Sequence, residues 1–361
     1  MKNSILPLTL LLFLIGTFGT ISCTKDKEET PQPETPFTPT AYSLRVPAGW
    51  PTPVIPEFNK MTVEGVRLGR MLFYDNILSM NGRSCSSCHH ADKSYSTPIF
   101  INTLGESISV PPLINVAWNP DFEWYAQVPV LDHVPLGDFT PEFFDSNMDT
   151  IVARIKAHPL YPQYFYEAFN IKDVAAITAD ELKLKCSYAM IQFVRTIITD
   201  NSKFDKVMRH ETAFSPEEMA GSMIYYTEAG DCFHCHGTPL LTNNVMTNNG
   251  LDTVFVGDNL GYYNVTGRPT DIGKFSAPTL RNVELTAPYM HDGRFQTLEE
   301  VVEFYNSGVH WTSPNIDPIM TKPFKEYGLM LTAQDKANLI AFLKTFTDTT
   351  IIHNPDYLSP F

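Results

Sequence analysis

Two short cysteine clusters of the same form constrain this chain more than any other feature of its sequence. Each reads C-x-x-C-H, and the members are Cys85, Cys88 and His89 in the first cluster and Cys232, Cys235 and His236 in the second. The spacing is typical of covalent haem attachment, in which both sulfurs bond to the porphyrin and the adjacent imidazole reaches the iron. We therefore predict two covalently bound c-type haems, with His89 and His236 as iron ligands.

Two other uses of paired cysteines fit the sequence less well. A zinc ribbon places its second pair roughly 15 to 20 residues after the first, whereas about 150 residues separate these clusters. A redox-active pair of the thioredoxin kind needs a flanking β-α-β pattern, which neither cluster has. His90 and His234 lie beside the clusters. We expect neither to bind iron, because each cluster already contains its imidazole.

The N-terminal segment points to export. Residues 1–22 read as a signal peptide, because Lys2 precedes an apolar run that is too short to span a bilayer. Cys23 follows directly and suggests a lipid anchor, with a plain secreted protein as the alternative. Residues 23–45 are polar and rich in proline, so we expect an extended tether. The protein is thus expected in the periplasm or as an outer-membrane lipoprotein.

The net charge of the chain limits the classes of partner that the protein is expected to bind. The formal net charge of −14 argues against nucleic acid and would suit a basic, soluble protein partner. Beyond the N-terminal segment the sequence has no apolar stretch of membrane length.

Helix signals dominate the body of the chain. Capping boxes at Thr178 and Glu181, Ser215 and Glu218, and Thr297 and Glu300 each open an amphipathic stretch. Cys186 falls inside the first of these stretches and is expected to be a buried free thiol. Alternating strand patterns are scarce, and the 28 prolines favour long loops. We predict an all-α fold of two cytochrome c-like haem domains with little sheet, at residues 46–200 and 201–361.

The segments around the clusters carry a family resemblance. "LGRMLFYDNILSMNGRSCSSCH" and "GKFSAPTLRNVELTAPYMHDGRFQTLEEVVEFY" resemble the bacterial di-haem cytochrome c peroxidases and their relative MauG. The likeness runs from about Leu68 to the end of the chain. It implies that the haem on the first cluster reacts with peroxide and that the haem on the second receives electrons and passes them inward.

The resemblance also implies residues around the first haem. A tryptophan between the haems would be Trp124, nine residues after Asn115, whereas the competing Trp118 would pack in a core. The pocket glutamine of the family is replaced by His133, and Glu142 is the candidate carboxylate that moves a proton between the peroxide oxygens. The alternatives are a surface histidine and a solvated loop glutamate.

The distal positions of both haems follow from the same comparison. Activatable peroxidases carry a loop histidine on the first haem, but no histidine lies between His90 and Asn115, and Glu106 takes its approximate place. We therefore predict a free sixth position at rest. For the second haem, Tyr305 stands where peroxidases have methionine and MauG has tyrosine, which lowers the potential. The alternative for Tyr305 is core packing, and the fallback ligands are Met290, Met320, His291 and His310.

Relatives also bind calcium between the domains. Ser276 and Pro278 match one part of that site, but Ser109 stands where the family has asparagine, so calcium stays an open alternative.

Three functions compete. The leading hypothesis is a peroxidase that reduces hydrogen peroxide with electrons from a small redox protein such as cytochrome c. The second is a MauG-like oxidase acting on a protein or organic substrate. The third is a non-catalytic di-haem electron carrier, which the missing distal histidine disfavours. A homodimer is an additional expectation from the family.

Overall fold

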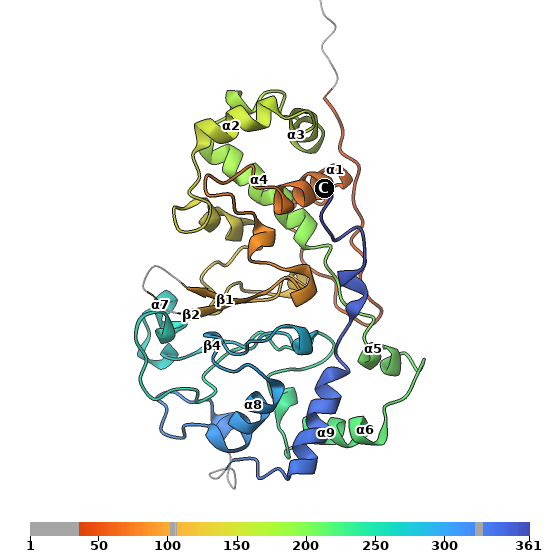
Figure 1. The fold of residues 1–361 in the computed structure, drawn as a ribbon, viewed down its shortest axis with the longest axis vertical. Coiled ribbons are helices and arrows are strands. Elements are labelled where there is room, and N and C mark those ends of the chain that lie inside the picture. The colour runs from red at the N-terminus through yellow and green to blue at the C-terminus, as the bar shows by residue number, and fades with distance from the viewer. Residues whose placement is uncertain (1–35, 102–104, 106, 322–327) are drawn as a thin grey trace, which may run out of the picture. The chain divides into compact units, whose positions relative to one another are not determined.

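Helices joined by long loops make up most of the described chain (Figure 1). The computed structural model describes residues 36–361 except 102–104, 106 and 322–327. The predicted signal peptide, Cys23 and Glu106 lie outside the described residues. The α-helices are α1 Val63–Tyr74, α2 Met148–Ala157, α3 Tyr161–Phe169, α4 Ala179–Val194, α5 Lys203–Met208, α6 Pro216–Tyr225, α7 Tyr263–Thr266, α8 Leu298–Glu303 and α9 Ala333–Lys344.

Sheet is limited to two small antiparallel pairs in the described residues. One joins β1 (Thr97–Ile101) to β2 (Ser107–Val110), and the other joins β3 (Met246–Thr247) to β4 (Phe275–Ser276). The expectation of a mostly helical fold with little sheet is therefore confirmed. Across the described ranges, no helix combines the length and the apolar character needed to cross a membrane.

The predicted caps start the helices as expected. The Thr178 hydroxyl accepts from the Glu181 amide at the start of α4, and reciprocal capping boxes open α6 at Ser215 and α8 at Thr297. Cys186 is a buried free thiol on α4, as predicted. Phe37–Phe361 form one packed unit, so the last part of the predicted tether, from Phe37 onward, lies within it.

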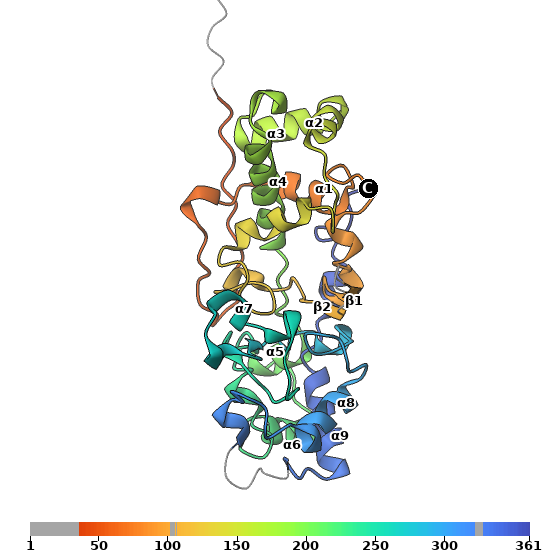
Figure 2. The ribbon, with the colours of Figure 1, turned by 90° about the vertical axis from the view of Figure 1, so that its left-hand side faces the viewer.

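Two helix pairs, α1 with α4 and α6 with α9, are packed through glycines. A Cβ on Gly69 of α1 would overlap the Ala189 carbonyl of α4, and a Cβ on Gly221 of α6 would overlap the Asn338 carbonyl of α9. Only glycine allows the two backbones to come this close. In Figures 1 and 2, α1 to α4 lie together, while α6, α8 and α9 lie together with the short strands between the two groups.

The loop that follows each cluster is fastened in the same way. Asn115 and Asn282 both have a left-handed backbone with φ of 57°, a conformation that asparagine tolerates. The Asn115 amide donates to the Ile197 carbonyl at 2.9 Å, just after α4. The Asn282 amide donates to the Phe346 carbonyl at 3.1 Å, just after α9. The two halves of the chain therefore use one construction twice.

The hydrophobic core is partitioned along the chain. Residues 68–190 supply one buried cluster, and residues 204–346 supply another. A third cluster joins parts of the first half to Ile351 near the C-terminus. The predicted division into two domains near residue 200 stays a prediction, which this partition supports.

The glycine contacts give a test of the fold. Gly69→Ala and Gly221→Ala should each lower the free energy of unfolding by roughly 1–3 kcal/mol, because a methyl group would force the paired helices apart. Gly137→Ala is the matched control, since nothing lies within 4 Å of its Cβ position, and it should change stability by less than about 0.5 kcal/mol. Urea unfolding followed by circular dichroism measures all three; equal effects at Gly69 and Gly137 would contradict the packing described.

Candidate functional site

Both C-x-x-C-H clusters fold into the same turn. A short 3₁₀ turn begins at the first cysteine, and the backbone amide of the histidine donates to the carbonyl of that cysteine. The distance is 2.9 Å from His89 to Cys85 and 3.0 Å from His236 to Cys232. A contact between residues four apart places their side chains on one side of the turn. The thiol and the imidazole of each cluster therefore face the same space.

The two histidines are prepared to bind a metal. His89 Nδ1 lies 2.7 Å from the Tyr95 carbonyl oxygen, and His236 Nδ1 lies 3.0 Å from that of Pro278. A carbonyl oxygen only accepts, so Nδ1 carries the proton and Nε2 keeps its lone pair. Desolvation lowers the pKa of both imidazoles to about 4, which keeps them neutral near pH 7. This is the metal-binding form.

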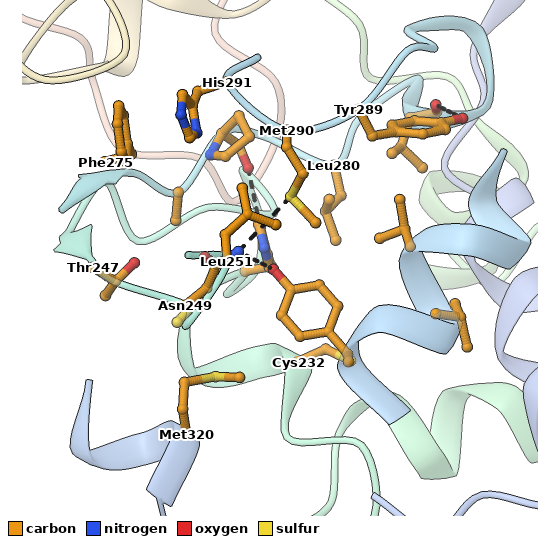
Figure 3. A pocket seen from close by; sticks show the side chains of 18 of the residues that line it. Cys232, Thr247, Asn249, Leu251, Phe275, Leu280, Tyr289, Met290, His291 and Met320 are labelled. Atoms are coloured by element: carbon orange, nitrogen blue, oxygen red, sulfur yellow. Dashed lines mark hydrogen bonds between the residues drawn. The ribbon is translucent and has the colours of Figure 1, made fainter. Parts of the chain in front are cut away.

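A cavity of about 250 Å³ lies beside the second cluster. Its walls combine Cys232, Cys235 and His236 with apolar side chains such as Leu280, Leu298, Val302 and Leu339. Figure 3 shows side chains from several loops and from helix α8 converging on this space. An apolar hollow next to two thiols that form no disulfide and a neutral imidazole fits the macrocycle of a c-type haem.

Tyr305 lines this cavity from a π-helical segment, Phe304–Gly308, that continues α8. Such π-turns are frequent at functional sites. Desolvation, together with the nearby cysteine thiols, raises the pKa of Tyr305 to about 12, against a hydrogen bond from Asn249 that lowers it. The Asn249 amide nitrogen lies 3.1 Å from the phenol oxygen. Tyr305 is thus placed as its predicted role requires, and that role stays a prediction.

The fallback ligands are distributed unevenly around the cavity. Met290, Met320 and His291 line it, whereas His310 is exposed. The ring of His291 stacks on Phe275 with centroids 3.7 Å apart, and its Nε2 lies 2.8 Å from the Asn259 amide oxygen. These contacts occupy the imidazole of His291 in packing and hydrogen bonding.

The residues that surround the first cluster differ from those around the second. The Cys85 sulfur lies 3.6 Å from the Met190 sulfur of α4. Asp138 is close enough that its charge, together with burial, raises the pKa of the thiols of Cys85 and Cys88. Desolvation and the neighbouring charge of Glu123 raise the pKa of Asp138 itself to about 7. A carboxyl group with this pKa can both hold and release a proton near neutral pH.

The two predicted pocket residues lie elsewhere on the same segment. Glu142 is half-buried, and its backbone carbonyl accepts from the Arg83 side chain at 2.9 Å. His133 is exposed, and its ring lies near-parallel to Phe58 at 6.2 Å and to Tyr188 at 6.5 Å, while these two rings contact each other at 5.4 Å. The described contacts of His133 thus lie at the surface, and both assignments stay predictions.

Of the two candidate tryptophans, only Trp124 lines the cavity of the second cluster. Its indole N–H donates to the Ser109 carbonyl, and its own carbonyl accepts from the Ser276 amide at 2.7 Å. Trp118 instead donates to the Pro51 carbonyl and packs edge-on against Trp50 at 5.0 Å. Trp124 therefore borders the cavity of the second cluster, and its predicted position between the two haems stays a prediction.

The residues predicted for calcium also border this cavity. Ser109, Ser276 and Pro278 all line it, and the Pro278 carbonyl accepts from His236. The backbone oxygens of Ser109 and Pro278 therefore already have hydrogen-bond partners. Calcium binding stays a prediction.

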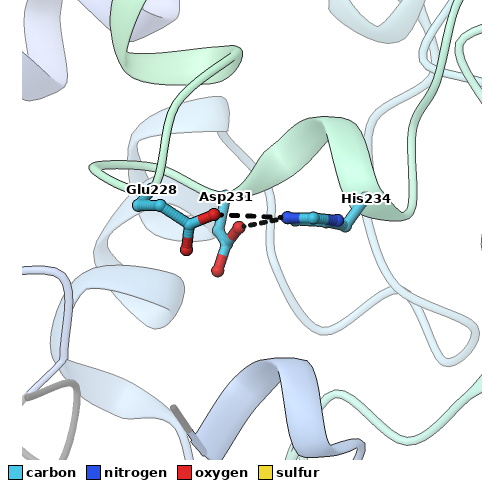
Figure 4. A group of neighbouring side chains, drawn as sticks. All are labelled: Glu228, Asp231 and His234. Carbon is cyan, nitrogen blue, oxygen red and sulfur yellow. Dashed lines mark ion pairs between the residues drawn. The ribbon is translucent and has the colours of Figure 1, made fainter. Parts of the chain in front are cut away.

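Both histidines expected to take no part in ligation have partners of their own. His90 Nε2 lies 3.0 Å from the Ser87 carbonyl. His234 Nε2 lies 3.0 Å from an Asp231 carboxylate oxygen and 3.6 Å from one of Glu228, as Figure 4 shows. The ligand atoms of Glu228, Asp231 and His234 lie close enough together to hold a metal ion. The contacts of the two carboxylates with the same His234 nitrogen account for this arrangement without one.

Comparison with known proteins agrees with this geometry. A family model described as di-haem cytochrome c peroxidase matches residues 63–213. Cytochrome-c peroxidase IdrP1 of Denitromonas iodatirespirans is 30% identical over 350 residues, which are 84% of this chain and 87% of the relative. The chain belongs to the di-haem cytochrome c peroxidase family. The methylamine utilization protein MauG of Methylorubrum extorquens is similar at 29% identity over 303 residues, covering 80% of each chain.

A solved structure extends the likeness to the fold. The crystal structure of a MauG-like protein associated with microbial copper homeostasis matches with a TM-score of 0.78 and 31% identity, over 89% of this chain and 99% of the other. Membership makes this di-haem protein an oxidoreductase of the peroxidase type and implies two c-type haems. The cysteine thiols outside disulfides, the neutral imidazoles and the apolar cavity fit that cofactor.

Three features of the site escaped sequence reasoning. Asn249 lies in a polar run that reads only as a loop, and Asp138 lies four residues before the glutamate that spacing selects. The carbonyls of Tyr95 and Pro278 bear no sequence signal at all, because every residue has a carbonyl. The duplicated P-x-L-x-N stretch, with Asn115 and Asn282, was the available signal for the two matching loops.

The carboxyl groups of the first site give a pH-dependent test. If Asp138 takes the proton from peroxide, turnover should rise with pH through about 7, because only its deprotonated form accepts a proton. Asp138→Asn should then lower kcat by about 10²-fold to 10⁴-fold and abolish that rise. Glu142→Gln is the matched comparison, and the reverse pattern, with Asp138→Asn fully active, would assign the proton to Glu142.

Proposed function

We propose that this protein reduces hydrogen peroxide to water, using electrons from a small soluble redox protein such as a cytochrome c. The observation that carries the proposal is the repeated turn that presents two thiols outside any disulfide and a neutral imidazole, once in each half of the chain. Peroxide reduction needs two electrons and two protons. Two haems, once attached, supply redox centres for both electrons.

The residues at each cluster have distinct proposed roles. Cys85 and Cys88 would hold the haem that meets peroxide, with His89 as its ligand. Cys232 and Cys235 would hold the haem that receives electrons, with His236 and Tyr305 as its ligands. The carbonyls of Tyr95 and Pro278 would orient the two imidazoles by accepting from Nδ1.

A carboxyl group would carry out the proton transfer at the first haem. Sequence spacing proposes Glu142, with His133 beside it. The structure adds Asp138, whose raised pKa suits a group that accepts one proton and returns it. Trp124 would stand between the two haem sites, where an aromatic ring shortens the path for electrons.

Electron delivery would come from a basic partner. The chain has a formal net charge of −14, which attracts cationic proteins and speeds their encounter. Export fits this proposal, because c-type haem attachment is completed outside the cytoplasm. An anchor on Cys23, a homodimer and a calcium ion are further parts of the proposal that the family resemblance supplies.

A MauG-like oxidase is the second candidate function. Tyr305 favours it, because the tyrosine lines the haem cavity where a methionine ligand would mark a typical peroxidase. Oxygen ligation lowers the reduction potential relative to methionine ligation. Its substrate would be a protein or a small organic molecule. The third candidate, an electron carrier without turnover, would need both irons to have two protein ligands.

Peroxide and electron donors separate these functions. The resting ferric protein should change its absorption spectrum at once with one equivalent of peroxide, because the first haem has an open position. Sustained turnover with reduced cytochrome c supports the peroxidase, and slow turnover with a long-lived spectral change supports the oxidase. A spectrum that stays constant with peroxide, before and after reduction, would leave only the carrier.

The tryptophan assignment gives a second test. Trp124→Phe should slow electron transfer from the second haem to the first by about tenfold or more, which corresponds to a barrier about 1.4 kcal/mol higher. Trp118→Phe, the matched control, should leave this rate unchanged because its ring packs against Trp50. Rapid-mixing kinetics with the half-reduced protein measures the rate, and equal rates in both variants would remove Trp124 from the path.

A further inference from the structure

One amide nitrogen touches both candidate ligands of the second haem. Asn249 Nδ2 lies 3.1 Å from the Tyr305 phenol oxygen and 3.8 Å from the Met290 sulfur. Figure 3 shows the dashed contact between Asn249 and Met290 inside the cavity that Cys232 borders. One NH₂ group thus contacts both the oxygen and the sulfur in the cavity where a sixth ligand of the iron would lie.

The backbone fixes the position of this donor. The neighbouring Asn248 is buried, and its amide donates to the Ser313 hydroxyl at 3.0 Å and to the Pro314 carbonyl at 2.7 Å. On the other side, the Gly250 carbonyl accepts from the His310 amide at 2.8 Å. Because both neighbours are anchored, the backbone of Asn249 is held beside the cavity, where its side-chain amide contacts Tyr305 and Met290.

The position of Met290 is held as firmly. Its backbone has φ of 70°, which is rare for a residue with a side chain and persists only where the surroundings enforce it. The bridge between Tyr289 and Phe295 and the bond from the Gly293 amide to the Met290 carbonyl supply that enforcement. Both candidate ligands are therefore available at the cavity, so a further interaction must decide which of them binds the iron.

The amide discriminates between the two by chemistry. A phenolate oxygen is a strong acceptor, and an N–H donor stabilises its negative charge. A thioether sulfur is only a weak acceptor and gains little from the same donor. In an apolar cavity the difference grows, because an unpaired charge is costly there. The donor thus favours oxygen ligation.

We propose that Asn249 is the positioning residue that makes Tyr305, and not Met290, the sixth ligand of the second haem. The inference rests on the proposed haem attachment at Cys232 and Cys235. It deepens the proposed function by naming the residue that sets the potential of the electron-receiving centre. Without the donor, the sulfur of Met290 gains the advantage and the potential rises.

The test uses the haem-loaded full-length protein. Asn249→Leu removes the donor at similar size, and Asn249→Asp replaces it with an acceptor in nearly the same shape, in case the first variant folds poorly. Both should gain the absorption band of thioether-ligated ferric haem and shift the midpoint potential of the second haem upward. Adding Met290→Leu to Asn249→Leu should abolish that band. Asn264→Leu, which removes an exposed amide bonded to Gly257, is the control and should change neither readout.

Tyr305→Phe separates the assignment of Tyr305 as a ligand from the selection of that ligand by Asn249. If Tyr305→Phe changes the spectrum while both Asn249 variants keep the wild-type spectrum and potential, the ligand assignment stands and the selection by Asn249 is overturned. If the Asn249 variants become five-coordinate without the thioether band, Met290 is not the competing ligand and the selection is again overturned. If Tyr305→Phe leaves the spectrum unchanged, Tyr305 is not the ligand, and both the ligand assignment and the selection by Asn249 are overturned, while the peroxidase proposal is unaffected.

Discussion

The hydrogen bond from each cluster histidine to a backbone carbonyl is the interaction on which the two sites depend. It fixes the proton on Nδ1 of His89 and of His236 and leaves Nε2 as the nitrogen that can bind iron. Burial lowers the pKa of both rings and keeps them neutral, so the same ring is held in orientation and in protonation state. The acceptor carbonyls belong to Tyr95 and Pro278, which lie on the loops that Asn115 and Asn282 fasten to the main helices. The orientation of each imidazole therefore depends on the helix packing beneath it.

The most regular parts of this arrangement were predictable from the sequence. The C-x-x-C-H spacing indicates its own turn, because both sulfurs and the imidazole have to reach the same haem. The capping residues Ser215 and Thr297 mark helix starts because their hydroxyls satisfy backbone amides that lack partners in the helix. Cys186 was placed in the core by its apolar neighbours alone. These are short-range effects, and short stretches of sequence carry them.

The rest of the site depends on contacts between distant segments. Asn249 meets Tyr305 across 56 positions of the chain, and Asp138 affects the thiols of Cys85 and Cys88 from a separate loop. A single sequence shows which residue types are present but not which loops meet. The proton-transfer residues illustrate the limit: position along the segment predicts Glu142 and His133, whereas only the folded chain shows that the charge of Asp138 also reaches the thiols of Cys85 and Cys88.

The matched glycine contacts and matched asparagine loops show that the two halves share a scaffold, whereas the groups above the two clusters differ. One side has carboxyl groups at Glu123 and Asp138, and the other has Tyr305, Met290 and Asn249. This division separates two tasks: the shared frame sets how each C-x-x-C-H turn is held, and the few side chains that differ beside each turn set what chemistry that half can carry out.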